Sequence, residues 1–206
     1  MRGPSRAGDA IAGIRTLALV GPAAAGKTSL AEALLQRAGA IATPGSLERG
    51  STVSDFDPLE RRVQHSLNAS VMHLQHAGTR VHFIDTPGAS DFLGQSLPAL
   101  EAVETAAIVI SAVNGIEPMA LRMMDWLIIV NKIDAPGVDL AGLLAQIQAS
   151  FGKECLPVNL PLTDKTSGGT NVVDCFFNRD GHSDFGSVDD AHRALVEQVV
   201  EVDADF

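Results

Sequence analysis

Short hydrophobic runs alternate along the chain with longer segments in which apolar residues recur every three or four positions. Residues 16–20 form a continuous apolar run that predicts a buried strand, and residues 29–38 carry apolar side chains at helical spacing and precede Gly39. Buried strands are predicted again over residues 106–113 and 127–134. Strands that alternate with helices in this way are typical of an α/β fold with a mostly parallel sheet.

One pair of predicted strands has a different relation. Residues 67–74 and 79–85 show a partial alternation of apolar and polar side chains, and Ala77 and Gly78 lie in a connection of the length expected for a hairpin turn. Strands joined by such a short turn are antiparallel. The predicted fold class is therefore α/β, with a mostly parallel sheet that has one antiparallel edge strand.

Three further helices are predicted in the middle of the chain. Residues 91–105 are compatible with a helix that is interrupted or restarted at Pro98. Residues 117–126 predict a helix with a proline in its first turn, and residues 139–149 predict an amphipathic helix that is capped by Asp139.

Two segments break this regular order. Residues 39–62 are polar, with proline, glycine and mixed charges, and loops of this length inside compact domains are usually functional or disordered. We expect this segment to be a mobile switch.

Trp126 runs directly into the strand that begins at Leu127, without the usual connection of about 2 to 6 residues. Either the helix gives up its last turn, or, as we expect, residues are absent between these two positions.

The last fifty residues have a different pattern. Residues 155–162 and 170–177 contain prolines or apolar residues around a Ser/Gly turn and predict two edge strands, and residues 188–202 predict a final helix. We place a boundary near residue 153. The predicted organisation is a loose leader over residues 1–14, a main domain over 15–153 and the start of a small α+β unit over 154–206.

Composition limits the classes of function. The chain has 206 residues and a formal net charge of −10, which argues against tight sequence-independent binding of free nucleic acid. No run reaches the roughly 20 apolar residues that span a membrane, and no signal-peptide pattern is present. Cys155 and Cys175 do not make a disulfide framework or a zinc spacing. We expect a cytoplasmic protein, without membrane contact, that is a monomer.

The segment GPAAAGKT, residues 21–28, fits the phosphate-binding loop pattern G-x-x-x-x-G-K-[ST]. In such a loop, backbone N–H groups cradle phosphates, Lys27 reaches the terminal phosphates and the Thr28 hydroxyl binds Mg²⁺. A predicted strand before it and a helix after it support this interpretation over a glycine-rich turn with a chance lysine. The residues predicted to contact the nucleotide phosphates are Gly21, Ala24, Ala25, Gly26, Lys27, Thr28 and Ser29.

Two further motifs follow at the ends of predicted strands, DTPG at residues 85–88 and NKID at residues 131–134. Asp85 is predicted to hold Mg²⁺ through a water molecule, and the Gly88 amide to contact the γ-phosphate. Asp134 can accept two hydrogen bonds from the N1–H and 2-amino groups of guanine, which discriminates against adenine by roughly 10⁴ or more. The residues predicted to recognise the base are Asn131, Lys132 and Asp134. The three motifs together predict a guanine-nucleotide-binding domain that uses GTP or GDP with Mg²⁺.

The chain resembles the translational GTPases, and more closely elongation factor G and its paralogues. The resemblance is carried by GPAAAGKT, DTPGASDF, NGIEP and NKID, and by the stretch from CLPVNLPL to GGTNVVDCFF, and it begins at about residue 14. It implies the P-loop GTPase domain of a multidomain factor that docks on the ribosome and uses GTP to drive translocation or subunit splitting. It also implies that residues 154–206 begin the subdomain that elongation factor G inserts within its GTPase domain.

The sequence departs from the family pattern at three places. Ala89 stands where the family usually has the histidine that positions the attacking water, and loss of such a group costs roughly 10² to 10⁴ in rate. His82, on the predicted strand before Asp85, is an unsuited substitute. Ser66 stands at the place of the threonine that meets Mg²⁺ in the first switch, with a polar strand start as the alternative interpretation. The last guanine motif is missing, so we expect a piece of a longer protein.

These departures keep three alternatives open. A regulatory GTP-binding module with little hydrolysis fits Ala89, and a ribosomal-protection paralogue fits the same motifs. An ATP-using P-loop kinase or ATPase is disfavoured by Asp134. The sequence therefore predicts guanine nucleotide binding with catalysis as an open question.

Overall fold

The computed structural model describes residues 13–54, 56–63, 66–88, 93–117, 126–164 and 169–202. By their internal contacts the residues fall into two compact units. The first unit comprises Met1–Ser111 and Glu117–Asn131, and the second comprises Ala112–Ile116 and Lys132–Phe206.

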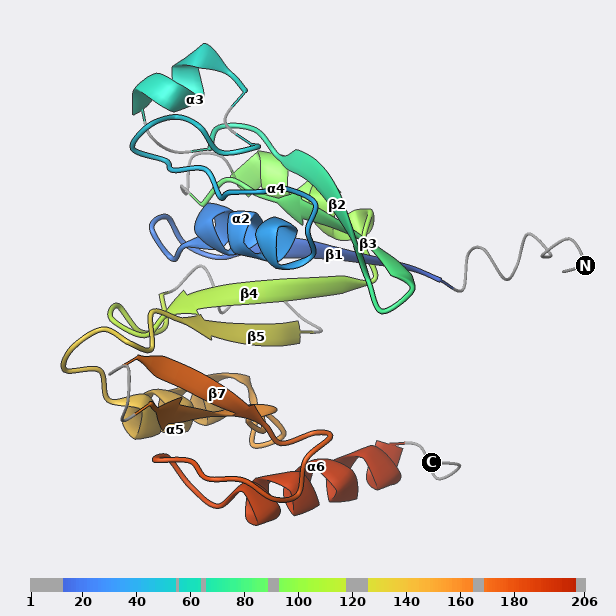
Figure 1. Ribbon diagram of the computed structural model, residues 1–206, viewed down its shortest axis with the longest axis vertical. Coiled ribbons are helices and arrows are strands. Elements are labelled where there is room, and N and C mark those ends of the chain that lie inside the picture. Colours follow the sequence, from blue (N-terminus) through green and yellow to red (C-terminus); the bar gives the residue numbers. More distant parts are fainter. Residues whose placement is uncertain are drawn as a thin grey trace, which may run out of the picture. The chain divides into compact units, whose positions relative to one another are not determined.

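A five-stranded sheet is the centre of the first unit (Figure 1). Its strands, in the order in which they lie side by side, are β2 (Ser70–His76), β3 (Thr79–Asp85), β1 (Ile14–Val20), β4 (Thr105–Ser111) and β5 (Trp126–Asn131). The pairs β3/β1, β1/β4 and β4/β5 are parallel, and the edge strand β2 is antiparallel to its neighbour. The predicted fold class, α/β with a mostly parallel sheet and one antiparallel edge strand, is confirmed.

The hairpin of β2 and β3 has its register fixed by a two-residue turn. Ala77 and Gly78 have φ values of 47° and 80°, which is the positive-φ pair that a tight hairpin turn requires. Along β2, buried and exposed residues alternate. This register aligns His73 with His82, whose rings lie 5.7 Å apart, so His82 is part of a cross-strand pair.

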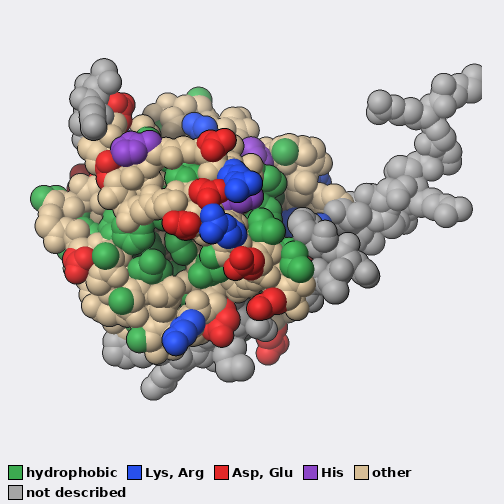
Figure 2. All heavy atoms as spheres, turned by 90° about the horizontal axis from the view of Figure 1, so that it is seen from below, with side chains coloured by type: hydrophobic (Ala, Val, Ile, Leu, Met, Phe, Trp, Pro, Cys, Tyr) green, Lys and Arg blue, Asp and Glu red, His purple; other side chains and the backbone are tan. Residues whose placement is uncertain are grey.

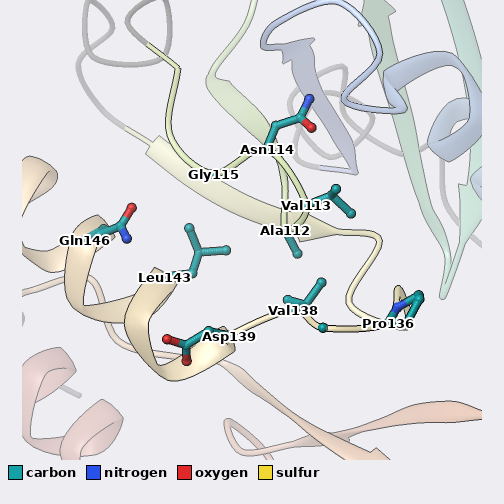
Figure 3. A pocket seen from close by; sticks show the side chains of 10 residues that line it. Ala112, Val113, Asn114, Gly115, Pro136, Val138, Asp139, Leu143 and Gln146 are labelled. Atoms are coloured by element: carbon teal, nitrogen blue, oxygen red, sulfur yellow. The ribbon is translucent and has the colours of Figure 1, made fainter.

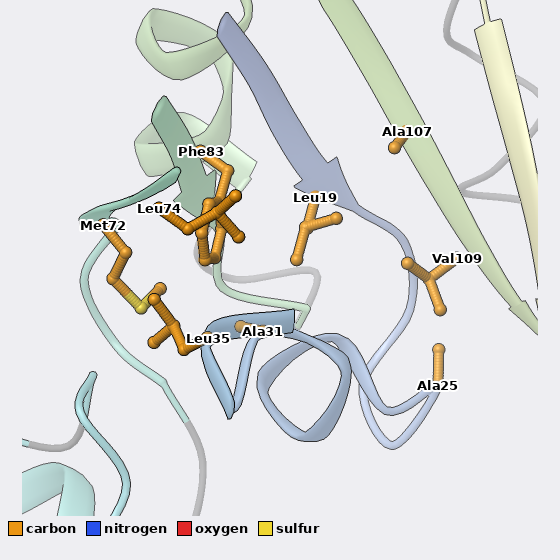
Figure 4. Packing of buried hydrophobic residues seen from close by; sticks show 9 residues of the cluster. All are labelled: Leu19, Ala25, Ala31, Leu35, Met72, Leu74, Phe83, Ala107 and Val109. Carbon is orange, nitrogen blue, oxygen red and sulfur yellow. The ribbon is translucent and has the colours of Figure 1, made fainter. Parts of the chain in front are cut away.

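One face of the sheet packs against helix α2 (Lys27–Arg37) (Figure 4). Leu19, Phe83 and Val109 point from three strands into this cluster, and Leu35 meets them from the helix. The alternate residues point to the other face and are also 0–1% exposed; they are Val20, Ile108 and Ile110. Both faces of the central strands are therefore covered, which accounts for the unbroken apolar run of β4.

We expect Phe83→Ala to lower the free energy of unfolding by about 3 to 5 kcal/mol, because Phe83 is 0% exposed and its removal leaves a cavity among β2, β3 and α2. Urea unfolding followed by circular dichroism measures this change. Val71→Ala on the neighbouring strand is the matched control, since Val71 is 70% exposed and should change stability by less than about 0.5 kcal/mol. Equal effects of the two substitutions would contradict the described packing.

The structure corrects three predictions about this unit. The segment 39–62 contains a short helix, α3 (Pro58–Val63), where a continuous loop was predicted. The Asp57 carboxylate accepts a hydrogen bond from the Leu59 amide at 2.7 Å and Pro58 takes the first helical position, a start signal that sequence reasoning missed. Strand β5 was predicted to be buried, yet Leu127 is 46% exposed, because β5 is an edge strand.

Helix α4 (Leu93–Glu101) contains Pro98 without ending there, so the predicted interruption is wrong. The helix predicted over residues 117–126 and the junction of Trp126 with the chain before it lie largely outside the described residues. Strand β5 begins at Trp126.

The second unit contains helix α5 (Leu140–Phe151), a hairpin of β6 (Asn159–Thr163) and β7 (Thr170–Asp174), and helix α6 (Val188–Val202) (Figure 1). The predicted cap of α5 is present, since the Asp139 carboxylate accepts a hydrogen bond from the Gly142 amide at 2.9 Å. The two strands pair antiparallel and are shorter than predicted. A small core joins the hairpin to α6 and consists of Leu160, Cys175, Val188 and Leu195.

Charged side chains on the face seen in Figure 2 are mixed in sign, with hydrophobic side chains between them. At the start of α6, Asp189 pairs with Arg179 and with Arg193, both at 2.6 Å. Hydrogen bonds from these two arginines lower the pKa of the Asp189 carboxyl group.

Cys155 and Cys175 are both free thiols. In the part of the chain that the structure describes, no helix is both long and apolar enough to cross a membrane.

Candidate nucleotide site

The phosphate loop connects the end of β1 to the start of α2 and approaches two neighbouring strands closely. Gly21 and Gly26 have φ values of 139° and 95°. A Cβ atom at Gly21 would collide with the carbonyl oxygen of Val109 in β4, and one at Gly26 with the side-chain amide of Asn131 in β5. Only glycine fits both positions, so the GxxxxG spacing is a requirement of this turn.

Helix α2 begins at Lys27 without a side-chain cap. Its first N–H groups therefore have no intrahelical acceptor, and such groups favour an anion at the helix N-terminus. Ala24 also has a positive φ of 61° and is exposed, whereas Ala25 is fully buried. Ser29 lies exposed in the first turn of the helix. Ala23 and Ala24 are thus the exposed part of the loop, and Ala25 is its buried part.

Lys27 is buried and lies over its own loop. Its ammonium group donates hydrogen bonds to the carbonyl oxygens of Gly21 and Pro22 at 2.8 and 2.9 Å. Burial lowers the pKa of Lys27 from 10.5 to about 8, and the negative charges of Asp85 and Glu117 partly oppose this shift. The Lys27 cation thus donates to neutral carbonyl oxygens. An incoming phosphate can replace these carbonyl oxygens.

We expect nucleotide affinity to fall as the pH rises from 7.0 to 8.5. With a pKa of about 8, the charged fraction of Lys27 in the free protein falls from about 0.9 to about 0.25, whereas a bound polyphosphate keeps it charged. The association constant should therefore fall by about fourfold, with proton uptake on binding at pH 8.5. Calorimetry in buffers of different ionisation enthalpy measures the uptake. Binding at pH 8.5 without proton uptake would contradict this assignment.

Three oxygen-bearing side chains predicted to bind Mg²⁺ come together beside the loop. The Thr28 hydroxyl donates a hydrogen bond to the Asp85 carboxylate at 2.6 Å, and the Ser66 hydroxyl lies 3.5 Å from that of Thr28. Thr28 and Asp85 are both buried. One carboxylate and two hydroxyls suit a hard cation such as Mg²⁺. Among the described residues no three His, Cys, Asp or Glu side chains form a group that could hold a metal ion, so a zinc-type site finds no support there.

The DTPG segment turns directly beneath Lys27. The Thr86 hydroxyl donates to the carbonyl oxygen of Leu19 at 2.8 Å, which fixes the segment to β1. A Cβ atom at Gly88 would collide with the Lys27 ammonium group and with the Ala23 amide. Gly88 therefore lies against both halves of the phosphate loop. Ala89, the residue at the position of the family's histidine, lies outside the described residues.

The three residues predicted to recognise guanine divide between the two units. Asn131, the last residue of β5, donates from its side-chain amide to the Ala25 carbonyl oxygen at 3.0 Å and so braces the phosphate loop. Lys132, with a φ of 59°, and Asp134 lie exposed in the turn that follows β5 and belong to the second unit. The structure thus brings together the phosphate loop with Ser66, Asp85, Gly88 and Asn131, while the turn with Lys132 and Asp134 belongs to the second unit.

Sequence reasoning missed two residues that shape this site. Glu32 in α2 and Glu60 in α3 are buried carboxylates that accept hydrogen bonds from backbone amides of the segment between α2 and β2. The start signal at Asp57 and Pro58 would have placed Glu60 on a helix. Nothing in the sequence distinguishes Glu32 from an exposed helical glutamate.

A cavity of about 320 Å³ lies in the second unit (Figure 3). It is lined by the chain after β4 and by the start of α5, including Asn114, Val138, Asp139 and Gln146. Asp139 already accepts the capping hydrogen bond of α5. None of the residues predicted to bind nucleotide or metal lines this cavity, so it is distinct from the candidate site.

The fold and the loop geometry define a P-loop nucleotide-binding domain of the mostly parallel α/β class. A family model described as the elongation factor Tu GTP binding domain matches residues 12–202, and the chain belongs to this family of translational GTPase domains.

Several relatives show the range of proteins that contain a similar domain. The chain is 33% identical over 209 residues to an elongation factor G-like protein of Mycobacterium tuberculosis, with 94% of this chain and 29% of that protein covered. It is 30% identical over 232 residues to peptide chain release factor 3 of Symbiobacterium thermophilum, with 95% and 43% covered. It is 37% identical over 140 residues to the tetracycline resistance protein TetW of Butyrivibrio fibrisolvens, with 64% and 22% covered.

A solved structure from Thermus thermophilus superimposes on the chain with a TM-score of 0.79 at 32% sequence identity. It matches 93% of this chain and 32% of its own length. The chain therefore spans less than half the length of these relatives.

Proposed function

We propose that the chain is the GTP/GDP·Mg²⁺-binding switch domain of an elongation factor G-like translation factor that acts on the ribosome. The observation that carries the proposal is the convergence of Lys27, Thr28, Asp85 and Gly88 around one glycine-shaped loop. Membership of the GTP-binding family supports the nucleotide class. We further propose the division into residues 15–153 as GTPase domain and 154–206 as the start of the inserted subdomain.

In this proposal each group has a separate role in holding the nucleotide. Lys27 exchanges its two carbonyl partners for the terminal phosphates, and the first amides of α2 face the phosphate oxygens. Thr28, Ser66 and, through a water molecule, Asp85 would hold Mg²⁺, which when bound neutralises charge on the phosphates. The Gly88 amide contacts the γ-phosphate, which is present only in GTP, so this segment reports the state of the nucleotide.

Recognition of the base is assigned to Asn131, Lys132 and Asp134. The Asp134 carboxylate accepts hydrogen bonds from the N1–H and 2-amino groups of guanine, and adenine has no matching pair of donors. Asp134 is exposed, so its carboxylate is open to a ligand. Asn131 acts indirectly, because its side-chain amide braces the phosphate loop through a hydrogen bond to the Ala25 carbonyl oxygen.

Whether the full-length protein hydrolyses GTP distinguishes two candidate functions. The methyl group of Ala89 can neither donate nor accept a hydrogen bond, so it cannot orient a water molecule as the family's histidine does. The second candidate is therefore a regulatory GTP-binding module, or a ribosomal-protection paralogue, with little intrinsic hydrolysis. We place the protein in the cytoplasm as a monomer, without membrane or free nucleic acid partners.

Isothermal titration calorimetry of this chain with GDP, GTP and ATP, each with Mg²⁺, tests the nucleotide class. We expect micromolar or tighter binding of both guanine nucleotides and none of ATP. ATP binding equal to GTP binding would refute the GTP-binding function. Phosphate release by the full-length protein, with and without ribosomes, then separates the candidates: ribosome-stimulated turnover supports the translation factor, and no turnover under either condition supports the regulatory module.

A further inference from the structure

Two buried glutamates accept hydrogen bonds from backbone amides of the segment that joins α2 to β2. Glu32 is 2% exposed and lies in α2, four residues after Thr28, and Glu60 is 1% exposed and lies in α3. Among the described residues neither carboxylate pairs with a lysine or an arginine. Burial of a carboxylate is costly unless hydrogen bonds satisfy it. The hydrogen-bond donors of Glu32 and Glu60 therefore show which parts of the backbone each carboxylate fixes.

Glu32 closes a loop onto α2. Its Oε2 atom accepts a hydrogen bond from the Gly45 amide at 2.6 Å, and its Oε1 atom accepts one from the Val53 amide at 2.5 Å. The two amides are the ends of a loop whose sides touch, because a Cβ atom at Gly45 would collide with the backbone of Ser51 and Thr52. Glu32 is on α2, the helix that starts at the phosphate loop. Its two hydrogen bonds therefore fix residues 45–53 to that helix.

Glu60 holds the chain immediately after Ser66. Its Oε1 atom alone accepts hydrogen bonds from the amides of Leu67 and Asn68, both at 2.9 Å. Its Oε2 atom is buried and has no hydrogen-bond partner among the described residues. Ser66 is the residue whose hydroxyl lies 3.5 Å from that of Thr28. The Glu60 carboxylate thereby fixes the backbone that places this hydroxyl beside the candidate metal site.

We propose that Glu32 and Glu60 are positioning residues for the nucleotide site. Glu60 acts through Ser66 and sets its hydroxyl beside that of Thr28, and Glu32 fixes the preceding loop to α2. The segment between α2 and β2 is thus held at two points by four backbone N–H donors. This inference rests on the proposed function where it concerns Mg²⁺, but the two anchor points themselves are properties of the protein alone.

The two glutamates use their oxygens differently, and this gives opposite expectations for the same substitution. In Glu60→Gln the single carbonyl oxygen can still accept from both Leu67 and Asn68, and the new amino group takes the position of an atom without a partner among the described residues. In Glu32→Gln one of the two amides, Gly45 or Val53, must face an amino group that cannot accept. We therefore expect glutamine to preserve both hydrogen bonds at position 60 and to break one of the two at position 32.

Amide hydrogen exchange of the nucleotide-free chain, followed by NMR, tests the anchor points. We expect Glu60→Ala to speed exchange at Leu67 and Asn68 by roughly tenfold or more, and Glu60→Gln by less than about threefold. Glu32→Gln should speed exchange at Gly45 or Val53 by roughly tenfold or more. Glu48→Gln is the matched control, because Glu48 is an exposed glutamate of the same segment. Equal effects of glutamine at Glu32 and Glu60 would overturn the proposal.

The gain in GTP affinity from Mg²⁺, measured with Mg²⁺ against EDTA, tests the link to the site. We expect Glu60→Ala to reduce this gain by about tenfold and Glu60→Gln to preserve it. Ser66→Ala should reduce it equally, and the double variant no further, because Glu60 acts through Ser66. Additive losses would overturn the positioning role. If the unmodified chain binds no guanine nucleotide, the proposed function fails and the link to Mg²⁺ with it, while hydrogen exchange still decides the anchor points.

Discussion

Lys27→Ala is expected to weaken the binding of both GDP and GTP by roughly 10²- to 10⁴-fold. Lys27 is a cation buried inside the phosphate loop, with its ammonium group between the carbonyl oxygens of Gly21 and Pro22. Each hydrogen bond from a charged donor to a phosphate contributes about 1.5 to 3 kcal/mol, and two such bonds to the terminal phosphates give this range. Calorimetry with Mg²⁺ at pH 7.0 measures the loss.

Fold stability should not fall in this variant. In the free protein the lysine is held in a desolvated position that lowers its pKa to about 8, so its removal relieves a burial cost when no nucleotide is bound. Lys153→Ala is the matched control, because Lys153 is exposed. Nucleotide affinity within threefold of the unmodified chain in Lys27→Ala would show that the glycine-shaped loop is a turn and not a phosphate site.

Asp134→Asn is expected to reduce guanine nucleotide affinity by roughly 10²-fold or more and to leave ATP unbound. The substitution keeps the shape of the side chain but replaces one acceptor oxygen by an amino group, which faces the 2-amino group of guanine as a second donor. Xanthine has a carbonyl oxygen at that position, so the variant should bind xanthosine diphosphate more tightly than GDP. Calorimetry with the two diphosphates measures this reversal.

The reversal separates base recognition from a general loss of folding, which would weaken all nucleotides alike. Asp180→Asn is the matched control, since Asp180 is an exposed aspartate of the same unit and is outside the predicted site. An unchanged preference for GDP in Asp134→Asn would place the guanine contacts elsewhere in the chain. Binding of ATP by the variant and by the unmodified chain alike would favour the kinase or ATPase alternative.

Much of the first unit could be predicted from the sequence because its signals are local. The apolar runs of β1 and β4, the hairpin turn at Ala77 and Gly78, and the strand–loop–helix order around Lys27 each follow from a few neighbouring residues. The predictions that were wrong concern features set by neighbours in space. β5 is half-exposed because it is the edge of the sheet, and α4 continues through Pro98.

The sequence by itself determined the order of the strands and of helices α2, α4, α5 and α6, the motifs GPAAAGKT, DTPG and NKID, and the glycines at residues 21, 26 and 88, because these depend on backbone conformation and residue type along the chain. Only the tertiary structure decided that Ser66 lies beside Thr28, that Asn131 braces Ala25, and that Glu32 and Glu60 are buried and bind backbone amides of the segment between α2 and β2. The physical reason is that a glutamate is polar in every sequence pattern. Its role is set by the backbone amides that folding brings to it, here from 7 to 21 residues away along the chain.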